Sequence, residues 1–496
     1  MFSDYQKYRF YEILPGLSIW LTLIIGAVLS FIAPLWMIYF IIIFDLYWVL
    51  RVMHFSFYLI LAWFRFRRAL RVDWLARLKN EFPRWEEKKN VVFLPLYDES
   101  FEVIESSLDA LLKSTYPAEK MCVALSGEER KKEHWDELRP KIAAQYAGRF
   151  ADLLFYTHPD GLPDEIRGKG SNINNMEKEF RKYADERGWN YDDIILSVFD
   201  IDTVAHPQYF SHLTYMYCRH PRPTHSSFQP VVLYDNNLWE SPGILRVMAF
   251  GTTFWTLFSL ARLDNLVTFS SHSMSFRAVV DCGGRAKNIV SEDSRIFYQC
   301  WLRYGGDYEV TPLYIPVSMD TVRDENWWKS LKNLYLQQRR WAWGAEHIPF
   351  LLWQWPRHPE ISRWKKFWLL FHEWEGKWSW GVVAIFITLL GRLPLWFAGE
   401  EVRQSALFFN TPRVLEVMMT LAMLGLLVSA AMSMLILPRR PASQPRFLYL
   451  AMILQWLLLP FSLVLFSAFP CLDAVGHLMF AKYLGFNVSV KKRISA

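Results

Sequence analysis

The stretch DDIILSVFDID, residues 192–202, joins a short apolar run to two aspartates separated by one residue. The run 194–199 has the length and composition of a buried β-strand. Asp200 and Asp202 follow it, and alternation along an extended chain would place both carboxylates on one side. Hard oxygen ligands at this spacing suit Mg²⁺ or Mn²⁺ bridging to a diphosphate, although a lone Asp-x-Asp is also a common surface turn.

Neighbouring segments predict the rest of a sheet. NVVFLPLYDES, residues 90–100, contains an apolar strand that ends in acidic residues, including Glu99. MCVALSGEER (121–130) and DLLFYTH (152–158) supply further strands, with helical stretches between them. This alternation indicates a mostly parallel sheet covered by helices on both faces, with ligands beyond the carboxyl ends of the strands.

Two polar segments could meet at that edge. RGKGSNINN, residues 167–175, places Arg167 and Lys169 with two glycines ahead of a helix. It is either an anion-binding turn or an ordinary loop with an Asn cap. In IVSEDSRIFYQCWLRYG (289–305), Glu292 and Asp293 open an amphipathic helix whose inward residues are expected to be Ile296, Phe297, Cys300 and Trp301. The helix dipole alone favours acids there, but a carboxylate at a cleft could also act as a general base.

The segment YLQQRRWAWG, residues 335–344, combines amides, guanidiniums and indoles. Within a helix, Gln337, Arg340 and Trp341 share one face, while Arg339 points elsewhere. Arg340 could bind a diphosphate and Trp341 could stack on a sugar ring. The alternative is an interfacial helix with arginines at the lipid headgroups and tryptophans in the aromatic belt.

Hydrophobic residues make up 52% of the 496 residues, and apolar runs concentrate this excess at the two ends of the chain. Residues 1–64 predict a transmembrane hairpin, residues 65–345 a water-facing domain, and residues 346–496 interfacial helices followed by transmembrane helices. No run between about 65 and 364 is expected to span a membrane. The predicted spans are 13–33, 34–50, 381–397, 415–437 and 447–469.

Basic residues after the second span, Arg65, Arg67, Arg68 and Arg71, predict that the domain faces the cytoplasm, in a bacterial inner membrane. If the last span crosses the membrane, the total number of crossings after the domain is odd. The basic residues 491–493 would then lie outside, so the location of the C-terminus stays open. The scattered cysteines suggest neither a zinc site nor a disulfide framework. A net charge of +6 by itself implies no nucleic-acid partner.

Taken in order, these pieces resemble the membrane-embedded processive family 2 glycosyltransferases, the group of cellulose synthases and hyaluronan synthases. The resemblance rests on Asp-Ile-Asp at 200–202, Ser-Glu-Asp at 291–293 in place of Thr-Glu-Asp, and QQRRW at 337–341. RGKGSNINN is also similar to the family's Lys-Ala-Gly-Asn-Leu-Asn segment. The matching region, about 91–347 with the flanking spans, covers roughly two thirds of the chain.

The resemblance implies a GT-A catalytic domain that uses a nucleotide-diphosphate sugar and Mg²⁺ or Mn²⁺. Asp200 and Asp202 would hold the metal, and Lys169, Asp200 and Glu99 would contact the nucleotide. Asp293 would be the catalytic base, supported by Glu292, and the reaction would be inverting. Gln337, Arg340 and Trp341 would bind the diphosphate and the acceptor, a polysaccharide or glycolipid.

Two positions depart from the family pattern. Ser126 stands where the family has a base-binding Asp, and FSSHSMSFR (269–277) has Ser271 and His272 in place of Gly and a small residue. His272 is either a packing residue or an acceptor contact. In FHEWEGKWSW (371–380), charges beside a span suggest a polysaccharide channel or an interfacial helix. The alternatives to a polysaccharide synthase are a single-addition transferase acting on a lipid and a non-catalytic sugar-nucleotide-binding membrane protein.

Overall fold

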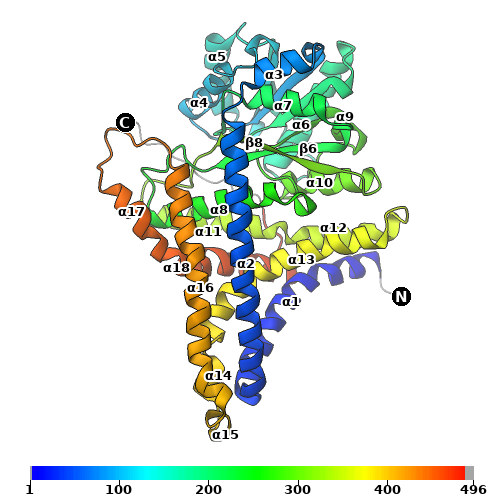
Figure 1. Cartoon of the computed structure of the whole chain (residues 1–496). Coiled ribbons are helices and arrows are strands. Elements are labelled where there is room, and N and C mark those ends of the chain that lie inside the picture. Colours follow the sequence, from blue (N-terminus) through cyan, green and yellow to red (C-terminus); the bar gives the residue numbers. More distant parts are fainter. Residues whose placement is uncertain (1–2, 486–496) are drawn as a thin grey trace.

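The computed structural model describes residues 3–485 of the chain. A sheet domain lies at one end, and long helices extend from its base (Figure 1). α1 (Asp4–Ile32) and α2 (Pro34–Ala69) lead into the domain. α13 (Arg363–Ile385), α16 (Ala406–Ile436) and α19 (Phe469–Met479) follow it.

One mixed sheet forms the centre of the domain, with the strand order β3-β2-β1-β4-β7-β6-β8-β5. The pairs β1–β2, β1–β4, β2–β3 and β6–β8 are parallel, and β7 is antiparallel to both β4 and β6. The mostly parallel sheet predicted from the sequence is therefore confirmed. The strands are β1 (Lys89–Pro95), β2 (Met121–Glu128), β3 (Asp152–His158), β4 (Ile194–Val198), β5 (Val204–Ala205), β6 (Ser226–Leu233), β7 (Ser273–Ser275) and β8 (Glu309–Ser318).

Successive side chains of the central strands point to opposite faces of the sheet. Helices cover both of these faces. Val91 and Phe93 of β1 pack in one core, Val92 and Leu94 in the other. The first core includes α6 (Lys169–Glu186), α8 (Gly243–Ala261), α9 (Phe276–Asp281) and α10 (Glu292–Arg303). The second includes α3 (Trp74–Glu81), α4 (Phe101–Leu112), α5 (Lys132–Tyr146) and α7 (Tyr209–Arg219).

Within residues 3–485, six helical segments are long and apolar enough to cross a membrane, which is consistent with a membrane protein. The expectation that no such segment lies within the domain is wrong, because α8 qualifies by length and composition. α8 packs against β6 and α2, so its apolar surface is largely covered by protein. The six are Asp4–Ile32, Pro34–Ala69, Gly243–Ala261, Arg363–Phe397, Ala406–Ile436 and Leu448–Met479.

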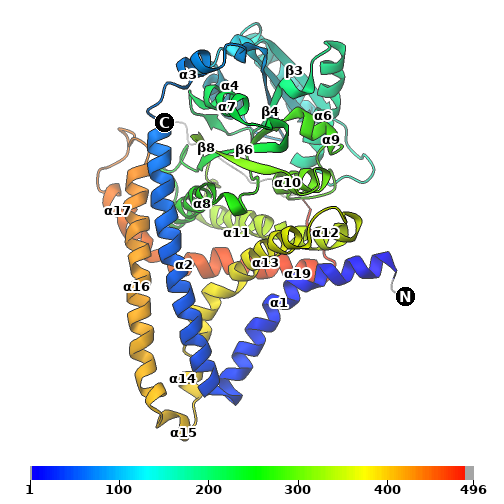
Figure 2. The ribbon, with the colours of Figure 1, turned by 45° about the vertical axis from the view of Figure 1, so that its right-hand side comes forward.

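The last of these segments does not run straight. α2 and α16 follow the long axis of the molecule, whereas α19 runs across the base of the sheet domain in both views (Figures 1 and 2). A π-helical turn, Val464–Ala468, precedes α19, and α19 packs against α1 and against α11 (Trp327–Ala342). The last described residues, up to residue 485, therefore lie near the sheet domain. The basic residues 491–493 lie outside the described part.

Candidate functional site

Four charged side chains meet at one edge of the sheet. Lys169 is the first residue of α6, Asp200 follows β4, and Glu292 and Asp293 open α10. The ammonium group of Lys169 lies 2.7 Å from Asp200 Oδ1, 3.0 Å from Asp293 Oδ1 and 3.4 Å from Glu292 Oε1. Three carboxylates from two distant segments thus surround one cation, which we call the Lys169 cluster.

Members of the Lys169 cluster differ in their access to solvent. The side chains of Asp200 and Asp293 are 25% and 24% exposed, whereas that of Glu292 is only 3% exposed. Glu292 therefore lies behind the other two carboxylates. A ligand approaching from solvent would meet Asp200 and Asp293 first.

Electrostatics within the Lys169 cluster follow from burial and like charge. Burial, and then the Asp293 carboxylate, raises the pKa of Glu292 to about 7, while Lys169 opposes this rise. Burial alone would lower the pKa of Lys169, but Asp200, Asp293 and Glu292 outweigh it and raise that pKa above its ordinary value. Lys169 therefore stays protonated, and the three carboxylates around it offset its charge.

The helix that carries Lys169 begins earlier than the sequence suggested. RGKGSNINN was expected to be a loop ahead of a helix, but α6 already starts at Lys169. Ser171 Oγ accepts a hydrogen bond from Gly168 N and donates one to Gly168 O, which closes the first turn. This placement directs the lysine side chain to the end of β4.

The two aspartates of the Asp-x-Asp motif are not equivalent. Residues 200–203 form a turn, closed by the hydrogen bond from Thr203 N to Asp200 O at 2.9 Å, so the extended arrangement expected for them is wrong. Asp200 Oδ2 accepts a hydrogen bond from Ser270 Oγ at 2.8 Å. Asp202 is buried, and its Oδ2 accepts one from the backbone N–H of Asp320 at 2.7 Å.

These aspartates could still hold a divalent cation. Among residues 3–485, no group of three or more His, Cys, Asp or Glu side chains is arranged to bind a metal ion. Mg²⁺, however, is often held by one or two carboxylates that share it with substrate phosphates. Asp200 and Asp202 offer carboxylate oxygens of the kind that such an arrangement needs.

Glu99 occupies the turn after β1. Its Oε2 accepts hydrogen bonds from the backbone N–H groups of Tyr97 at 2.7 Å and Asp98 at 3.1 Å. Burial raises the pKa of Glu99, and the Asp202 carboxylate adds to the rise. Glu99 therefore lies within electrostatic reach of the Asp-x-Asp turn, but its carboxylate is engaged by its own loop.

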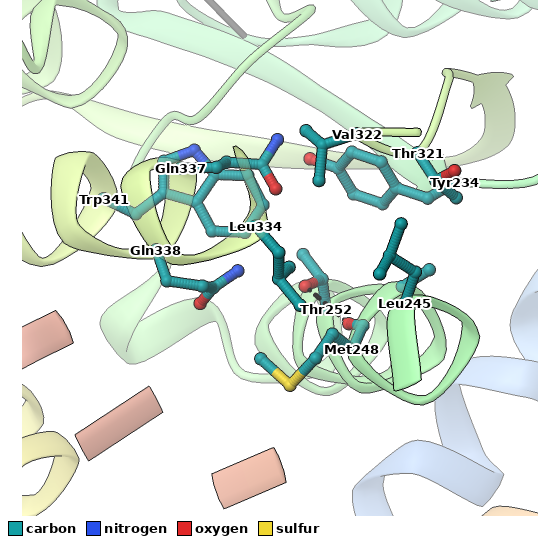
Figure 3. Close-up of a pocket in the computed structure, with 11 residues that line it drawn as sticks. Tyr234, Leu245, Met248, Thr252, Thr321, Val322, Leu334, Gln337, Gln338 and Trp341 are labelled. Atoms are coloured by element: carbon teal, nitrogen blue, oxygen red, sulfur yellow. Dashed lines mark hydrogen bonds between the residues drawn. The ribbon is translucent and has the colours of Figure 1, made fainter. Parts of the chain in front are cut away.

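The QQRRW segment forms the end of α11, beneath the sheet. Gln337 and Trp341 line a small pocket of about 20 Å³ together with Tyr234 (Figure 3). The Trp341 and Tyr234 rings lie 6.1 Å apart between centroids. Arg339 turns to α19, where its NH1 lies 3.2 Å from Asp473 Oδ2. This pocket has room for about one water molecule and is too small for a sugar ring.

Tyr234 is a residue that the sequence analysis missed. Burial, and then the charges of Asp200, Asp202 and Asp293, raise its pKa, while Arg340 opposes the rise. Tyr234 thus lies within electrostatic reach of both the Lys169 cluster and Arg340 of α11. The signal available in the sequence was the polar segment YDNN directly after the apolar β6, since strand ends carry ligands in such sheets.

The two positions that depart from the family pattern are buried. Ser126 is buried, and its carbonyl accepts a hydrogen bond from Asn172 Nδ2 at 3.1 Å. His272 is also buried, and its Nδ1 donates to Phe269 O while its Nε2 accepts from Arg285 NH2. Burial, and then Arg285, lower the pKa of His272 well below its ordinary value. The neutral imidazole is a packing residue here.

Charges of the segment 371–380 contact different elements. Glu375 pairs with Arg51 of α2 at 3.2 Å. The Lys377 side chain lies against Gly344, just after α11. These contacts join α13 to α2 and to the QQRRW region, so the charges link helices to one another at the base of the domain.

Comparisons with known proteins gave matches among solved structures. No family model matches the chain, and no curated protein matches it. Mannosyltransferase PcManGT from Pyrobaculum calidifontis, in complex with GDP-Man and Mn²⁺, aligns with a TM-score of 0.42 and 14% identity over 88% of this chain and 99% of that one. S. aureus TarS 1–349 with UDP-GlcNAc aligns with a TM-score of 0.33 and 13% identity, over 72% of this chain and 98% of that one.

Proposed function

We propose that this protein is an inverting glycosyltransferase that moves a sugar from a nucleotide-diphosphate sugar to a hydroxyl of a growing polysaccharide. The observation that carries the proposal is the Lys169 cluster. It gathers the Asp-x-Asp and Ser-Glu-Asp motifs at the carboxyl edge of the sheet, and Tyr234 links it to the QQRRW helix. The domain would be of the GT-A type, facing the cytoplasm of a bacterial inner membrane.

Asp293 is the proposed base, since it is the more accessible carboxylate of α10. It accepts the proton of the acceptor hydroxyl as that oxygen forms a bond to the anomeric carbon. The bond from this carbon to the diphosphate breaks on the opposite side, which inverts the configuration. Glu292 adds negative charge behind the base once it is ionised, above its pKa of about 7.

Lys169 and Arg340 are the proposed partners of the departing diphosphate. Both are cations, and guanidinium groups bind phosphate oxygens through paired hydrogen bonds. Asp200 and Asp202 would hold Mg²⁺ or Mn²⁺, which when bound supplies positive charge that stabilises the leaving group. Glu99 would contact the nucleotide, and Gln337 and Trp341 would hold the acceptor.

The decisive experiment is turnover of nucleotide sugars by the purified full-length protein. UDP- and GDP-linked sugars are incubated separately with Mg²⁺ or Mn²⁺, and release of the nucleoside diphosphate is measured. Wild-type turnover with at least a 100-fold loss in Asp293→Asn is expected, because general-base groups contribute ~10²–10⁴-fold. Binding without turnover would instead support a non-catalytic sugar-nucleotide-binding membrane protein.

Product length separates two kinds of transferase. A polysaccharide synthase gives a ladder or a long polymer on a gel, whereas transfer to a lipid gives one added sugar. Export through the membrane helices is part of the proposal, since Lys377 of α13 lies against Gly344, just after the QQRRW helix. Sealed vesicles that accumulate polymer in the lumen would support export.

A further inference from the structure

A buried polar network joins the helix of the proposed base to the end of the QQRRW helix. Glu346 lies five residues beyond Trp341. Its Oε1 accepts hydrogen bonds from Ser291 Oγ at 3.0 Å and Ser291 N at 3.4 Å. Its Oε2 accepts one from Trp343 Nε1 at 3.0 Å. One carboxylate thus bridges the residue before Glu292 and the turn that follows α11.

The next residue makes a second bridge to the same helical turn. His347 Nδ1 accepts a hydrogen bond from Arg295 Nε at 3.2 Å, and His347 Nε2 donates to Ser294 Oγ at 2.7 Å. Arg295 NH2 also donates to Glu346 O at 3.3 Å. Burial, and then Arg295, lower the pKa of His347 well below its ordinary value, which keeps Nδ1 free to accept.

The geometry constrains both segments together. His347 and Arg295 are buried, and the Arg295 guanidinium stacks 3.8 Å from the centroid of the Phe350 ring. Hydrogen bonds in such an environment are costly to break, because a buried polar group would lose its partner. Neither Glu346 nor His347 belongs to the Lys169 cluster or to the pocket around Trp341. The contacts of Glu346 and His347 therefore lie outside both sites.

We propose that Glu346 and His347 are positioning residues that hold Asp293 in register with Arg340 and Trp341. This inference rests on the proposed glycosyl transfer. Ser291, Ser294 and Arg295 form the α10 side of this Glu346–His347 clamp, and Trp343 belongs to the other side. Through it, displacement of the QQRRW helix on ligand binding would displace the base as well.

The test compares Glu346→Ala, which removes both bridges of the carboxylate, with Glu346→Gln, which keeps an acceptor for Ser291. For Glu346→Ala we expect kcat to fall about 10- to 100-fold with the donor KM changed less than about threefold, since small misplacement of reacting groups lowers rate more than binding. Glu346→Gln should recover part of the rate. Glu360→Ala is the matched control, because Glu360 pairs with His358 on the surface at 2.9 Å.

Hydrogen exchange provides a readout independent of activity. In Glu346→Ala, backbone amides of 291–295 and of 341–347 should exchange faster together, with β1 unchanged. Unaltered kcat in a folded Glu346→Ala protein, or lost kcat without faster exchange in 291–295, would overturn the clamp. If Glu346→Ala does not fold, Glu346→Gln decides by the same two measurements.

Failure of the proposed function is distinguishable from failure of the clamp. A wild-type protein that turns over no nucleotide sugar refutes the function. The exchange experiment then decides alone whether the two segments are coupled: joint loosening supports the clamp as a structural coupling, and loosening of only one segment refutes it.

Discussion

Lys169 brings together charges that are distant along the chain, with Asp293 lying 124 residues away. The carboxylates differ in burial, and this difference separates their expected roles. Asp200 and Asp293 are accessible, whereas Glu292 is enclosed with a pKa raised to about 7. We therefore expect turnover to respond to pH near neutrality.

Glu292→Gln should change the pH profile of turnover. Ionisation of Glu292 as the pH rises through about 7 adds negative charge beside Asp293, so wild-type kcat/KM should increase across this interval. The neutral amide cannot ionise, so the variant should lack that increase and be less active above pH 7. Initial rates between about pH 5.5 and 9 check this. A variant profile that still rises through neutrality would assign the ionisation to another group.

Ser271 combines strain with two useful contacts. Its φ of 62° is in the left-handed region, and its Oγ lies 2.9 Å from Thr203 Oγ1 and 3.4 Å from Asp200 N. Ser271→Ala should destabilise the protein by about 1–2 kcal/mol, because the bonds are lost and the strain remains. Ser271→Gly should cost less, since glycine adopts this conformation readily. Thermal unfolding of the two variants in detergent gives the order, and a more stable alanine variant would contradict it.

At the scale of elements, a buried ion pair holds the segment between α9 and α10 against α6. The side chains of Arg285 and Glu177 are 0% and 4% exposed, and Glu177 also accepts from Arg285 N at 2.8 Å. Arg285 in turn donates to His272, which precedes β7. The Asp200 turn therefore depends on α6 through both Lys169 and this pair.

Glu177→Ala should lower the free energy of unfolding by about 3–5 kcal/mol, because it leaves the buried guanidinium of Arg285 without its carboxylate. Glu179→Ala on the same helix is the control, since Glu179 is 40% exposed and pairs with Lys182 at the surface. Its expected effect is below about 1 kcal/mol. Denaturant unfolding followed by tryptophan fluorescence measures both. Equal effects in the two variants would show that the Arg285 pair adds nothing to stability.

At the scale of the whole molecule, the arrangement of helices predicts sidedness. α2 and α16 extend away from the sheet domain, and the turn between α14 (Leu393–Phe397) and α16 lies at the far end (Figure 1). The segment Leu448–Met479 lies along the base of the domain (Figures 1 and 2). We therefore expect the turn on one side of the membrane and residues 443 and 483 on the side of the domain.

Single cysteines at three exposed positions test this sidedness. In intact cells, an impermeant maleimide should label Gln404→Cys, in the turn before α16, and should label Ser443→Cys and Tyr483→Cys only after permeabilisation. The unmodified protein serves as the control for its own cysteines. Labelling of Tyr483→Cys from outside would mean that the last segment crosses the membrane.

Local patterns in the sequence predicted part of the architecture. Apolar runs ending in charge predicted β1, β2, β3 and β4, because strands buried on both faces must be apolar along their length. The spacing of Ile296, Phe297, Cys300 and Trp301 predicted the buried face of α10, and all four are buried. The membrane segments followed from their length, except α8, whose coverage by protein no local pattern reveals.

What the sequence by itself determined is which side chains stand at the strand and helix ends, and therefore which chemistry is available. Only the tertiary structure decided that Lys169 sits among three carboxylates, that residues 200–203 turn, and that Glu346 reaches Ser291. These relations join segments far apart in the chain. Their distances depend on how helices pack on the sheet and on one another, and the periodicity of a single segment carries no information about that packing.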